Sequence, residues 1–171
     1  VEDMDHDGRL DLYVPSLGYA VPVSGTMLVC ASSYQRVQAA TKIVQDLNAL
    51  GFDLALKSVD YEEYLTLLRA GNFDLYYGEV RLSPNFDLSP FFQSGGSLSY
   101  GSLADSTMQS LCNRMLVNSG NSYNLYQRLC DRGYLTPVMF KNYAVYTTRG
   151  SVTEPARYID WLLPAPETVS D

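Results

Sequence analysis

The chain begins with alternating carboxylates that have the composition of a cation-binding loop. Asp3, Asp5 and Asp7 are separated by single residues, and a glycine follows them. A fourth aspartate, Asp11, comes shortly afterwards. Such a segment can wrap carboxylate oxygens and the backbone carbonyl of Arg9 around a hard cation. The candidate ligands of a structural calcium ion are therefore Asp3, Asp5, Asp7, Arg9 and Asp11.

This D-x-D-x-D-G-x-x-D pattern resembles the calcium loops of EF-hands, dockerins and integrin-type propellers. It departs from the EF-hand pattern at the twelfth position, where Val14 replaces the bidentate glutamate. The alternative interpretation is a solvated acidic turn that leads into a strand. We expect no cofactor other than this calcium ion.

A second group of chemically capable residues follows a short apolar segment, residues 73–77. Glu79 and Arg81 begin a long loop that extends to residue 101 and contains a Ser-Gly-Gly turn at residues 94–96. Long loops at the carboxyl edge of an open α/β sheet commonly carry ligand-binding residues. The loop therefore predicts half of a binding site.

Histidine-dependent catalysis has little support in this sequence. His6 is the one histidine, so Ser-His-Asp and Cys-His arrangements would depend on it and a two-histidine zinc site is impossible. The remaining enzymatic hypothesis is a hydrolase that uses two carboxylates. Its clustered candidates are Asp74, Glu79 and Asp87.

Composition restricts the partners and the compartment. The 171 residues are enough for a single well-buried domain. They carry a formal net charge of −7, and the 12 basic residues are scattered along the sequence. Nucleic acid is therefore not an expected partner. No apolar run approaches the about 20 residues that span a bilayer, and we expect any export signal to lie outside this sequence. Cys30, Cys112 and Cys130 form no C-x-x-C pair, which favours buried free thiols over a zinc site or a disulfide framework.

The elements that must position these residues follow a β-α-β-α-β order. Continuous or alternating apolar residues predict strands, and capping residues with helical spacing predict the helices between them. The expected elements are strand 26–31, helix 33–50, strand 52–59, helix 61–71 and strand 73–77. Short connections favour a parallel sheet.

Flanking segments complete the predicted organisation. Helical spacing continues over 103–117 and 123–132, and two short strands are expected within 135–146. Prolines and glycines in 13–25 predict an irregular connection. We therefore divide the chain into an acidic turn and lead-in (1–25), an α/β lobe (26–150) and a proline-containing tail (151–171).

The order of the motifs resembles the C-terminal lobe of extracellular solute-binding proteins of family 5, the peptide-binding and dipeptide-binding components of ABC importers. The resemblance covers most of residues 3–150. It rests on the D-x-D-x-D-G turn and on the segments Leu50-Gly51, Asp60-Tyr61-Glu62-Glu63-Tyr64, Leu68-Arg69-Ala70-Gly71-Asn72-Phe73-Asp74 and Leu88-Ser89-Pro90-Phe91-Phe92-Gln93-Ser94-Gly95-Gly96. Members of the family are longer and have two lobes.

The resemblance implies a periplasmic-binding-protein-like α/β fold and no catalysis. It also implies an extracytoplasmic location, either periplasmic or as a cell-surface lipoprotein. The implied partners are a small-molecule or peptide ligand, the missing N-terminal lobe of the parent chain and the membrane permease of an ABC importer. The solute, whether peptide, sugar or metal chelate, stays open.

The resemblance further implies that the segment after the last strand faces the ligand. Peptide-binding relatives have an aspartate in a Trp-x-x-Asp-Tyr stretch there, whereas residues 78–84 contain neither Asp nor Trp. Glu79 could replace that carboxylate, and Arg81 could bind a ligand carboxylate through a bidentate fork. The alternative is that both residues pair with each other or face solvent. The ligand-binding candidates are Tyr77, Gly78, Glu79, Val80, Arg81, Ser94, Gly95 and Gly96, although the last three could form only a turn.

One further alternative is a calcium-stabilised extracellular interaction module. In that hypothesis the acidic loop is the functional centre, and some of the 14 tyrosines form a surface for a protein partner.

Overall fold

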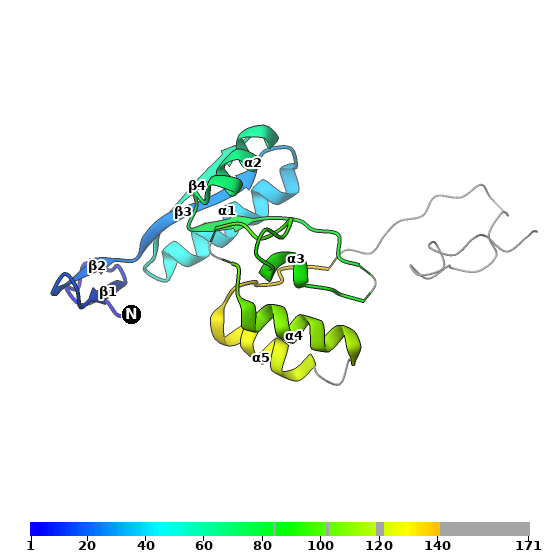
Figure 1. Ribbon diagram of the computed structural model, residues 1–171. Coiled ribbons are helices and arrows are strands. Elements are labelled where there is room, and N and C mark those ends of the chain that lie inside the picture. The colour runs from blue at the N-terminus through cyan, green and yellow to red at the C-terminus, as the bar shows by residue number, and fades with distance from the viewer. Residues whose placement is uncertain (84, 102, 119–121, 141–171) are drawn as a thin grey trace, which may run out of the picture. The chain divides into compact units, whose positions relative to one another are not determined.

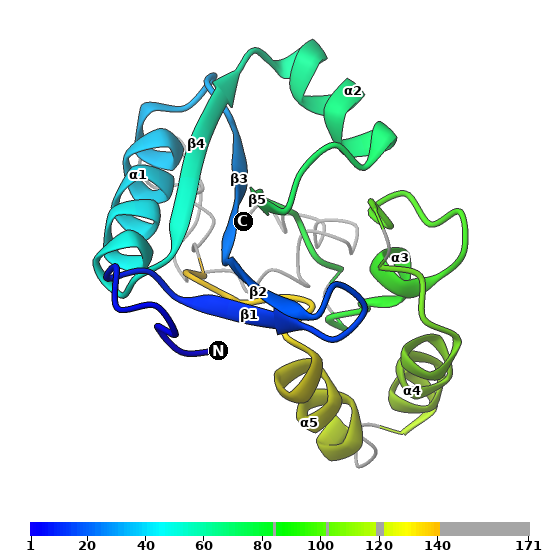
Figure 2. The same cartoon turned by 90° about the vertical axis from the view of Figure 1, so that its left-hand side faces the viewer.

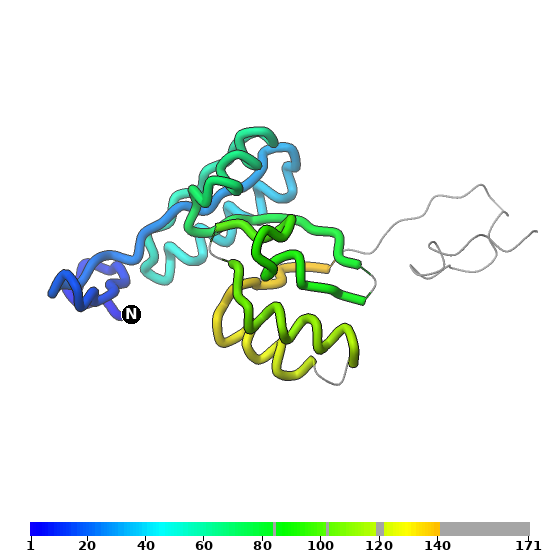
Figure 3. Tube along the Cα trace, viewed as in Figure 1, coloured from blue at the N-terminus to red at the C-terminus, as the bar shows by residue number. Residues whose placement is uncertain are grey.

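The computed structural model describes residues 1–83, 85–101, 103–118 and 122–140. The chain forms two compact units. Unit 1 consists of Val1–Arg81 and Ser97–Ala104, and unit 2 consists of Leu82–Gly96 and the chain from Asp105 onward. Figure 3 traces the path of the chain through both units. The predicted division into 1–25, 26–150 and 151–171 stays a prediction, and its last segment lies outside the described residues.

Unit 1 contains a three-stranded parallel sheet. Its strands are β3 (Ser24–Cys30), β4 (Asp53–Val59) and β5 (Leu75–Tyr77), in the order β4-β3-β5. Both neighbours run parallel to β3, and Figure 1 labels β3 and β4. The predicted strands and their parallel arrangement are therefore confirmed.

Two helices cover the sheet, α1 (Tyr34–Ala49) and α2 (Tyr61–Ala70). Successive side chains of β3 point to opposite faces, so Met27 and Val29 pack with the core of α1. Leu28 and Cys30 pack with the core of α2. Figure 2 shows the two helices on opposite sides of the strands. Burial on both faces explains why the sequence of β3 is continuously apolar rather than alternating.

Capping residues lie at the start of both helices and at the end of α2. The side chain of Ser33 accepts a hydrogen bond from the first turn of α1. Asp60 Oδ1 accepts one from the backbone N–H of Glu63 at 2.9 Å, which caps α2. Gly71 ends α2 with a φ of 70°, in the left-handed region that glycine adopts without strain. These caps stop each helix at the point where the chain must turn back to the sheet.

The predicted irregular connection over 13–25 is wrong. Residues Asp11–Val14 (β1) and Tyr19–Pro22 (β2) form an antiparallel hairpin. Its loop, residues 15–18, ends at Gly18 with a φ of 75°. The two prolines are compatible with this hairpin because Pro15 lies in the loop and Pro22 ends β2, where a missing N–H does little harm.

The described residues of unit 2 contain helices and no strand. Unit 2 contains α3 (Ser89–Phe92), α4 (Ser106–Val117) and α5 (Ser122–Arg132) around a core that includes Phe92, Met108, Cys112 and Leu125. Helix α3 is a single turn inside the predicted long loop, too short to produce a helical period in the sequence. Residues 135–140 form no strand, and the rest of the two strands predicted within 135–146 lies outside the described residues.

Two of the three cysteines are buried thiols, as expected. Cys30 and Cys112 are buried, and burial is the main cause that raises the pKa of Cys112 to about 11. Cys130 is exposed on α5, so the expectation of a buried thiol is wrong for this residue. Within the described part of the chain, no helix is long and apolar enough to cross a bilayer.

Asp105 joins three parts of unit 2. Its Oδ1 caps α4 by accepting hydrogen bonds from the backbone N–H groups of Thr107 (2.8 Å) and Met108 (3.0 Å). Its Oδ2 accepts hydrogen bonds from Arg128 Nη2 at 3.1 Å and from the Tyr134 hydroxyl at 2.8 Å. The backbone donor of Met108 contributes most to lowering the pKa of this carboxyl below its usual range.

Replacing Asp105 should destabilise unit 2. We expect Asp105→Ala to lower the free energy of unfolding at pH 7 by about 2 kcal/mol, because an N-cap and two further hydrogen bonds are lost. Because the folded-state pKa is lowered, this contribution is fully present above the ordinary value of 3.8 and declines as the pH falls through the folded-state value. Urea unfolding at pH 7 and pH 3 measures both effects. Asp131→Ala, which removes an exposed carboxylate from α5, is the matched control, and an equal loss in both variants would contradict this role.

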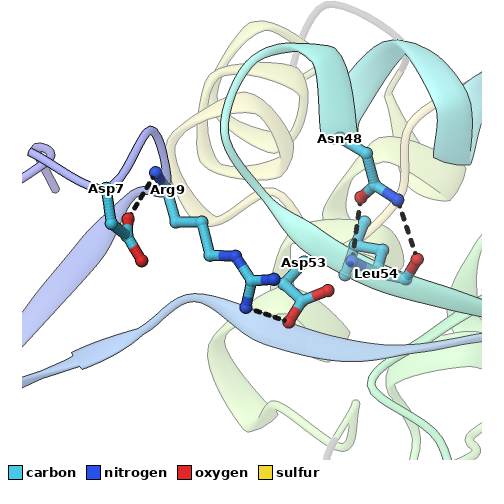
Figure 4. A network of polar contacts seen from close by, with 5 residues as sticks. All are labelled: Asp7, Arg9, Asn48, Asp53 and Leu54. Carbon is cyan, nitrogen blue, oxygen red and sulfur yellow. Dashed lines mark hydrogen bonds and ion pairs between the residues drawn. The ribbon is translucent and has the colours of Figure 1, made fainter.

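Asn48 protects the outer edge of the sheet in unit 1. Among the described strands, β4 lies at the edge of the sheet, so its outward backbone groups have no neighbouring strand there. The Asn48 side chain donates through Nδ2 to the carbonyl of Leu54 (2.9 Å) and accepts through Oδ1 from the Leu54 N–H (2.8 Å), as Figure 4 shows. One amide thus supplies both bonds of a missing strand.

Asn48→Ala should therefore reduce stability more than a comparable change elsewhere on α1. Two hydrogen bonds to backbone groups are lost, partly offset by the higher helix propensity of alanine, so the expected loss is about 1 to 2 kcal/mol. Chemical denaturation measures it, with the exposed neighbour Gln45→Ala as the control. If Gln45→Ala costs as much, the pairing with Leu54 contributes no specific stability.

Candidate functional site

The candidate site begins at the carboxyl edge of the parallel sheet. Cys30 ends β3 beside Val59, which ends β4. Tyr77 ends β5 one position earlier, beside Val29. The residues that follow these three strands therefore leave the sheet at the same edge. Residues 78–81, four of the predicted ligand-binding residues, belong to this set.

An ion pair links two of these exits. Nε of Arg36 lies 3.4 Å from Oε2 of Glu79. Arg36 is in the first turn of α1, directly after β3, and Glu79 follows β5, the neighbouring strand. Their side chains are 32% and 47% exposed, so both charges remain accessible to a ligand. Arg36 was not among the residues predicted to bind a ligand. Its position in the first turn of the helix that follows the central strand is the signal that could have identified it.

The guanidinium of Arg36 is not fully satisfied by this pair. Its Nε is buried and has no hydrogen-bond acceptor among the described residues, because the contact with Glu79 meets the ion-pair distance but not the hydrogen-bond geometry. A buried donor without an acceptor costs about 1 to 3 kcal/mol.

The backbone just before Glu79 is held in place by aromatic residues. The Tyr64 hydroxyl donates a hydrogen bond to the carbonyl of Tyr77 at 3.2 Å. Burial is the main cause that raises the pKa of Tyr64, which keeps this hydroxyl protonated and able to donate. A Cβ atom at Gly78 would lie 3.1 Å from the ring of Tyr76, so the chain passes close to this ring. Val80 and Arg81 follow as exposed residues.

The three remaining candidates, Ser94, Gly95 and Gly96, belong to unit 2. They form a tight turn after α3, in which the N–H of Gly96 donates to the carbonyl of Gln93 at 2.8 Å. A Cβ atom at Gly96 would lie 2.3 Å from the carbonyl oxygen of Pro90, so only glycine fits there. One of the expected backbone donors is thus occupied within the turn. Ser94 and Gly95 are exposed.

The acidic N-terminal loop brings together three of its four predicted aspartates. Oxygen atoms of Asp3, Asp5 and Asp11 lie within 4.8 Å of one another. Asp7 does not belong to this group, and its Oδ1 accepts a hydrogen bond from the N–H of Arg9 at 2.8 Å. The Arg9 guanidinium pairs with Asp53 at 2.9 Å, as Figure 4 shows. The loop is therefore a second candidate site within unit 1.

Of the carboxylates in the hydrolase hypothesis, Asp74 and Glu79 lie at opposite ends of β5 and do not form a catalytic pair. Asp74 precedes β5 and accepts a hydrogen bond from the N–H of Thr26 at 2.7 Å, whereas Glu79 follows the other end of the same strand. Asp87 belongs to unit 2, where its Oδ1 accepts a hydrogen bond from the N–H of Ser89 at 2.8 Å. Asp74 and Asp87 thus serve as backbone caps, which argues against an acid-base pair.

Comparison with known proteins identifies the class of fold. No protein-family model matches the chain, and no curated protein sequence matches it. Solved structures do match, and they show a periplasmic-binding-protein-like α/β fold, as the resemblance implied. The chain spans about a quarter of the length of these structures, covering 27%, 26% and 23% of the three described next.

The particular neighbours are transport-associated binding proteins. The oligopeptide-binding protein AppA from Bacillus subtilis, solved with a nonapeptide, aligns with 78% of this chain at 18% identity and a TM-score of 0.63. The periplasmic binding protein MelB from Agrobacterium fabrum, solved with stachyose, aligns with 78% at 17% identity and a TM-score of 0.57. A nickel ABC transporter protein from Bacillus halodurans aligns with 67% at 15% identity and a TM-score of 0.54.

Alanine substitutions in the turn at residues 94–96 measure how tightly Gly96 is packed. Gly96→Ala should destabilise the chain by about 3 kcal/mol, because a Cβ atom would overlap backbone. Gly95→Ala should cost about 1 kcal/mol, because Gly95 has a φ of 72° but open space around its Cα. Thermal or urea unfolding of the two variants measures the difference, and a Gly96→Ala loss no larger than that of Gly95→Ala would contradict the packing.

Proposed function

We propose that this chain is the ligand-gripping C-terminal lobe of an extracellular solute-binding protein of an ABC importer, of the family 5 type. The observation that carries the proposal is the Arg36–Glu79 ion pair at the carboxyl edge of a periplasmic-binding-protein-like sheet. Ligands bind outside the carboxyl ends of the strands in open α/β sheets. The chain acts by binding and not by catalysis.

The charges at this edge favour an oligopeptide or a similar small zwitterionic solute. Glu79 would accept hydrogen bonds from a ligand ammonium group, and Arg36 and Arg81 would bind a carboxylate or carbonyl oxygens. An exposed ion pair contributes only about 0 to 1 kcal/mol to stability, so exchanging it for ligand contacts costs the protein little. AppA, solved with a nonapeptide, is a precedent for a peptide ligand on this fold, whereas the stachyose of MelB carries no charge that Glu79 or Arg36 could pair with.

The proposal extends to the partners and the location. An N-terminal lobe would supply the other half of the cleft, and closure of the two lobes about a hinge would deliver most of the affinity. A membrane permease would then receive the solute. We place the protein outside the cytoplasm, in the periplasm or as a cell-surface lipoprotein. Ligand binding would require no cofactor and no nucleic acid.

Thermal melting tests the solute class. The two-lobed protein that we propose to contain this chain is melted with di- to hexapeptides, malto-oligosaccharides and nickel chelates. A ligand that binds only the folded state stabilises it by about 2.7 kcal/mol at a hundredfold excess over the dissociation constant. We expect a rise with peptides alone. A response to none of the three classes would reject the solute-binding role, and a response to calcium alone would favour the interaction module.

Charge-removing variants test the site. Glu79→Gln and Arg36→Gln should each weaken peptide binding about tenfold or more, measured by calorimetry, because each removes one charge-assisted hydrogen bond. The control is Lys42→Gln, which breaks an exposed ion pair with Asp46 on the same helix as Arg36. Peptide binding that survives both site variants unchanged would place the ligand elsewhere on the protein.

A further inference from the structure

The group Asp3, Asp5 and Asp11, which we call the acidic triad, lies in the N-terminal part of unit 1. Asp3 and Asp5 come from the loop, and Asp11 is the first residue of β1. One carboxylate oxygen from each residue lies within 4.8 Å of the others. Asp11 is only 4% exposed, so this is not simply a cluster on a solvated surface.

The charges of the acidic triad are not balanced by basic side chains. Among the ion pairs of the described residues, none includes Asp3, Asp5 or Asp11. The nearest lysine or arginine in the sequence, Arg9, instead pairs with Asp53 at 2.9 Å (Figure 4). Three carboxylates at this separation repel one another, and a buried charge without a cationic partner is costly.

Backbone donors satisfy only part of the triad. The N–H of Gly8 donates to Asp3 Oδ2 (3.1 Å), and the N–H of Asp7 donates to Asp5 Oδ1 (3.2 Å). Asp11 Oδ2 accepts from the N–H of Met4 at 3.0 Å. The second carboxylate oxygen of Asp3, Oδ1, is fully buried and accepts no hydrogen bond within the described part of the chain. A buried, unpartnered carboxylate oxygen beside two more carboxylates is independent evidence for a missing positive charge.

We propose that Asp3, Asp5 and Asp11 bind one calcium ion. The group offers only oxygen ligands, without the histidine or cysteine that zinc and copper prefer. Calcium accepts an irregular arrangement of oxygens completed by water and backbone carbonyls, whereas magnesium demands a near-ideal octahedron. Asp7 was also predicted to be a calcium ligand. It is not assigned as a direct ligand because its side chain accepts a hydrogen bond from the N–H of Arg9 and lies outside the group.

The bound ion would stabilise the attachment of the N-terminal loop to the rest of unit 1. Glu2 and Asp11 exchange backbone hydrogen bonds, at 2.9 and 3.3 Å. The adjacent residue, Leu10, donates its N–H to the carbonyl of Gly51 at 2.7 Å, at the connection between α1 and β4. Neutralising the triad would therefore stabilise the attachment of the loop and of the β1–β2 hairpin. This role is structural and does not depend on the proposed solute-binding function.

Isothermal titration calorimetry on the 171-residue chain tests the site. After removal of metal with EDTA, calcium chloride should bind at one site with a dissociation constant of about 10⁻³ M or tighter. Magnesium chloride should bind more weakly, and calcium should raise the melting temperature in the same concentration range. The highest calcium concentration, 10 mM, is about tenfold above that dissociation constant. If calcium at this concentration produces neither binding heat nor a shift in melting temperature, the proposal is overturned.

Matched variants locate the ion. Asp3→Asn and Asp5→Asn should each weaken calcium binding at least about tenfold, because each removes one charged ligand. Asp7→Asn is the control: it removes a charge from the same loop and keeps an oxygen that can cap Arg9, so calcium binding should change about threefold or less. Melting curves without calcium verify that the variants fold. Equal losses in Asp7→Asn and Asp3→Asn would show that the loop attracts calcium only through its overall charge and would overturn the assigned triad.

Discussion

The burial of β3 on both faces is the constraint on which the rest of unit 1 depends. A strand with apolar side chains on both sides must be covered by two helices, and a parallel neighbour on each side requires a crossover connection for each pair. Helices α1 and α2 satisfy both requirements at once. Burial of each large side chain of β3 contributes about 1.5 to 3 kcal/mol, more than any of the exposed ion pairs nearby.

The same arrangement creates the candidate binding edge. Because all three strands run in one direction, their carboxyl ends meet, and residues far apart in the sequence become neighbours there. Arg36 and Glu79 are 43 positions apart in the sequence, yet their charged atoms are 3.4 Å apart. The core provides a rigid support, and the polar residues that leave it can vary without disturbing the core. This separation of roles is compatible with neighbours of the same fold that were solved with a peptide and with a sugar.

Peripheral parts of the chain are held by polar contacts instead of by a large core. The side chain of Asn48 replaces a missing strand, and Asp105 joins two helices of unit 2 to Tyr134. In the acidic triad the contacts are incomplete, because buried oxygen is left without a donor. Polar groups in partly buried positions contribute to stability only when each has a partner. A bound cation is the partner that would complete this group.

The sequence by itself determined the β-α-β-α-β order from β3 to β5 and the parallel sheet, because these follow from local apolar spacing and from capping residues such as Ser33 and Asp60. It also singled out the acidic loop and Glu79. The tertiary structure alone decided that Arg36 pairs with Glu79, that Asp7 lies outside the triad, and that residues 11–22 form a hairpin. The first two depend on which side chains meet after folding, and local sequence patterns carry no information on that. The hairpin depends on a turn whose glycine and prolines are equally compatible with a hairpin and with an irregular loop.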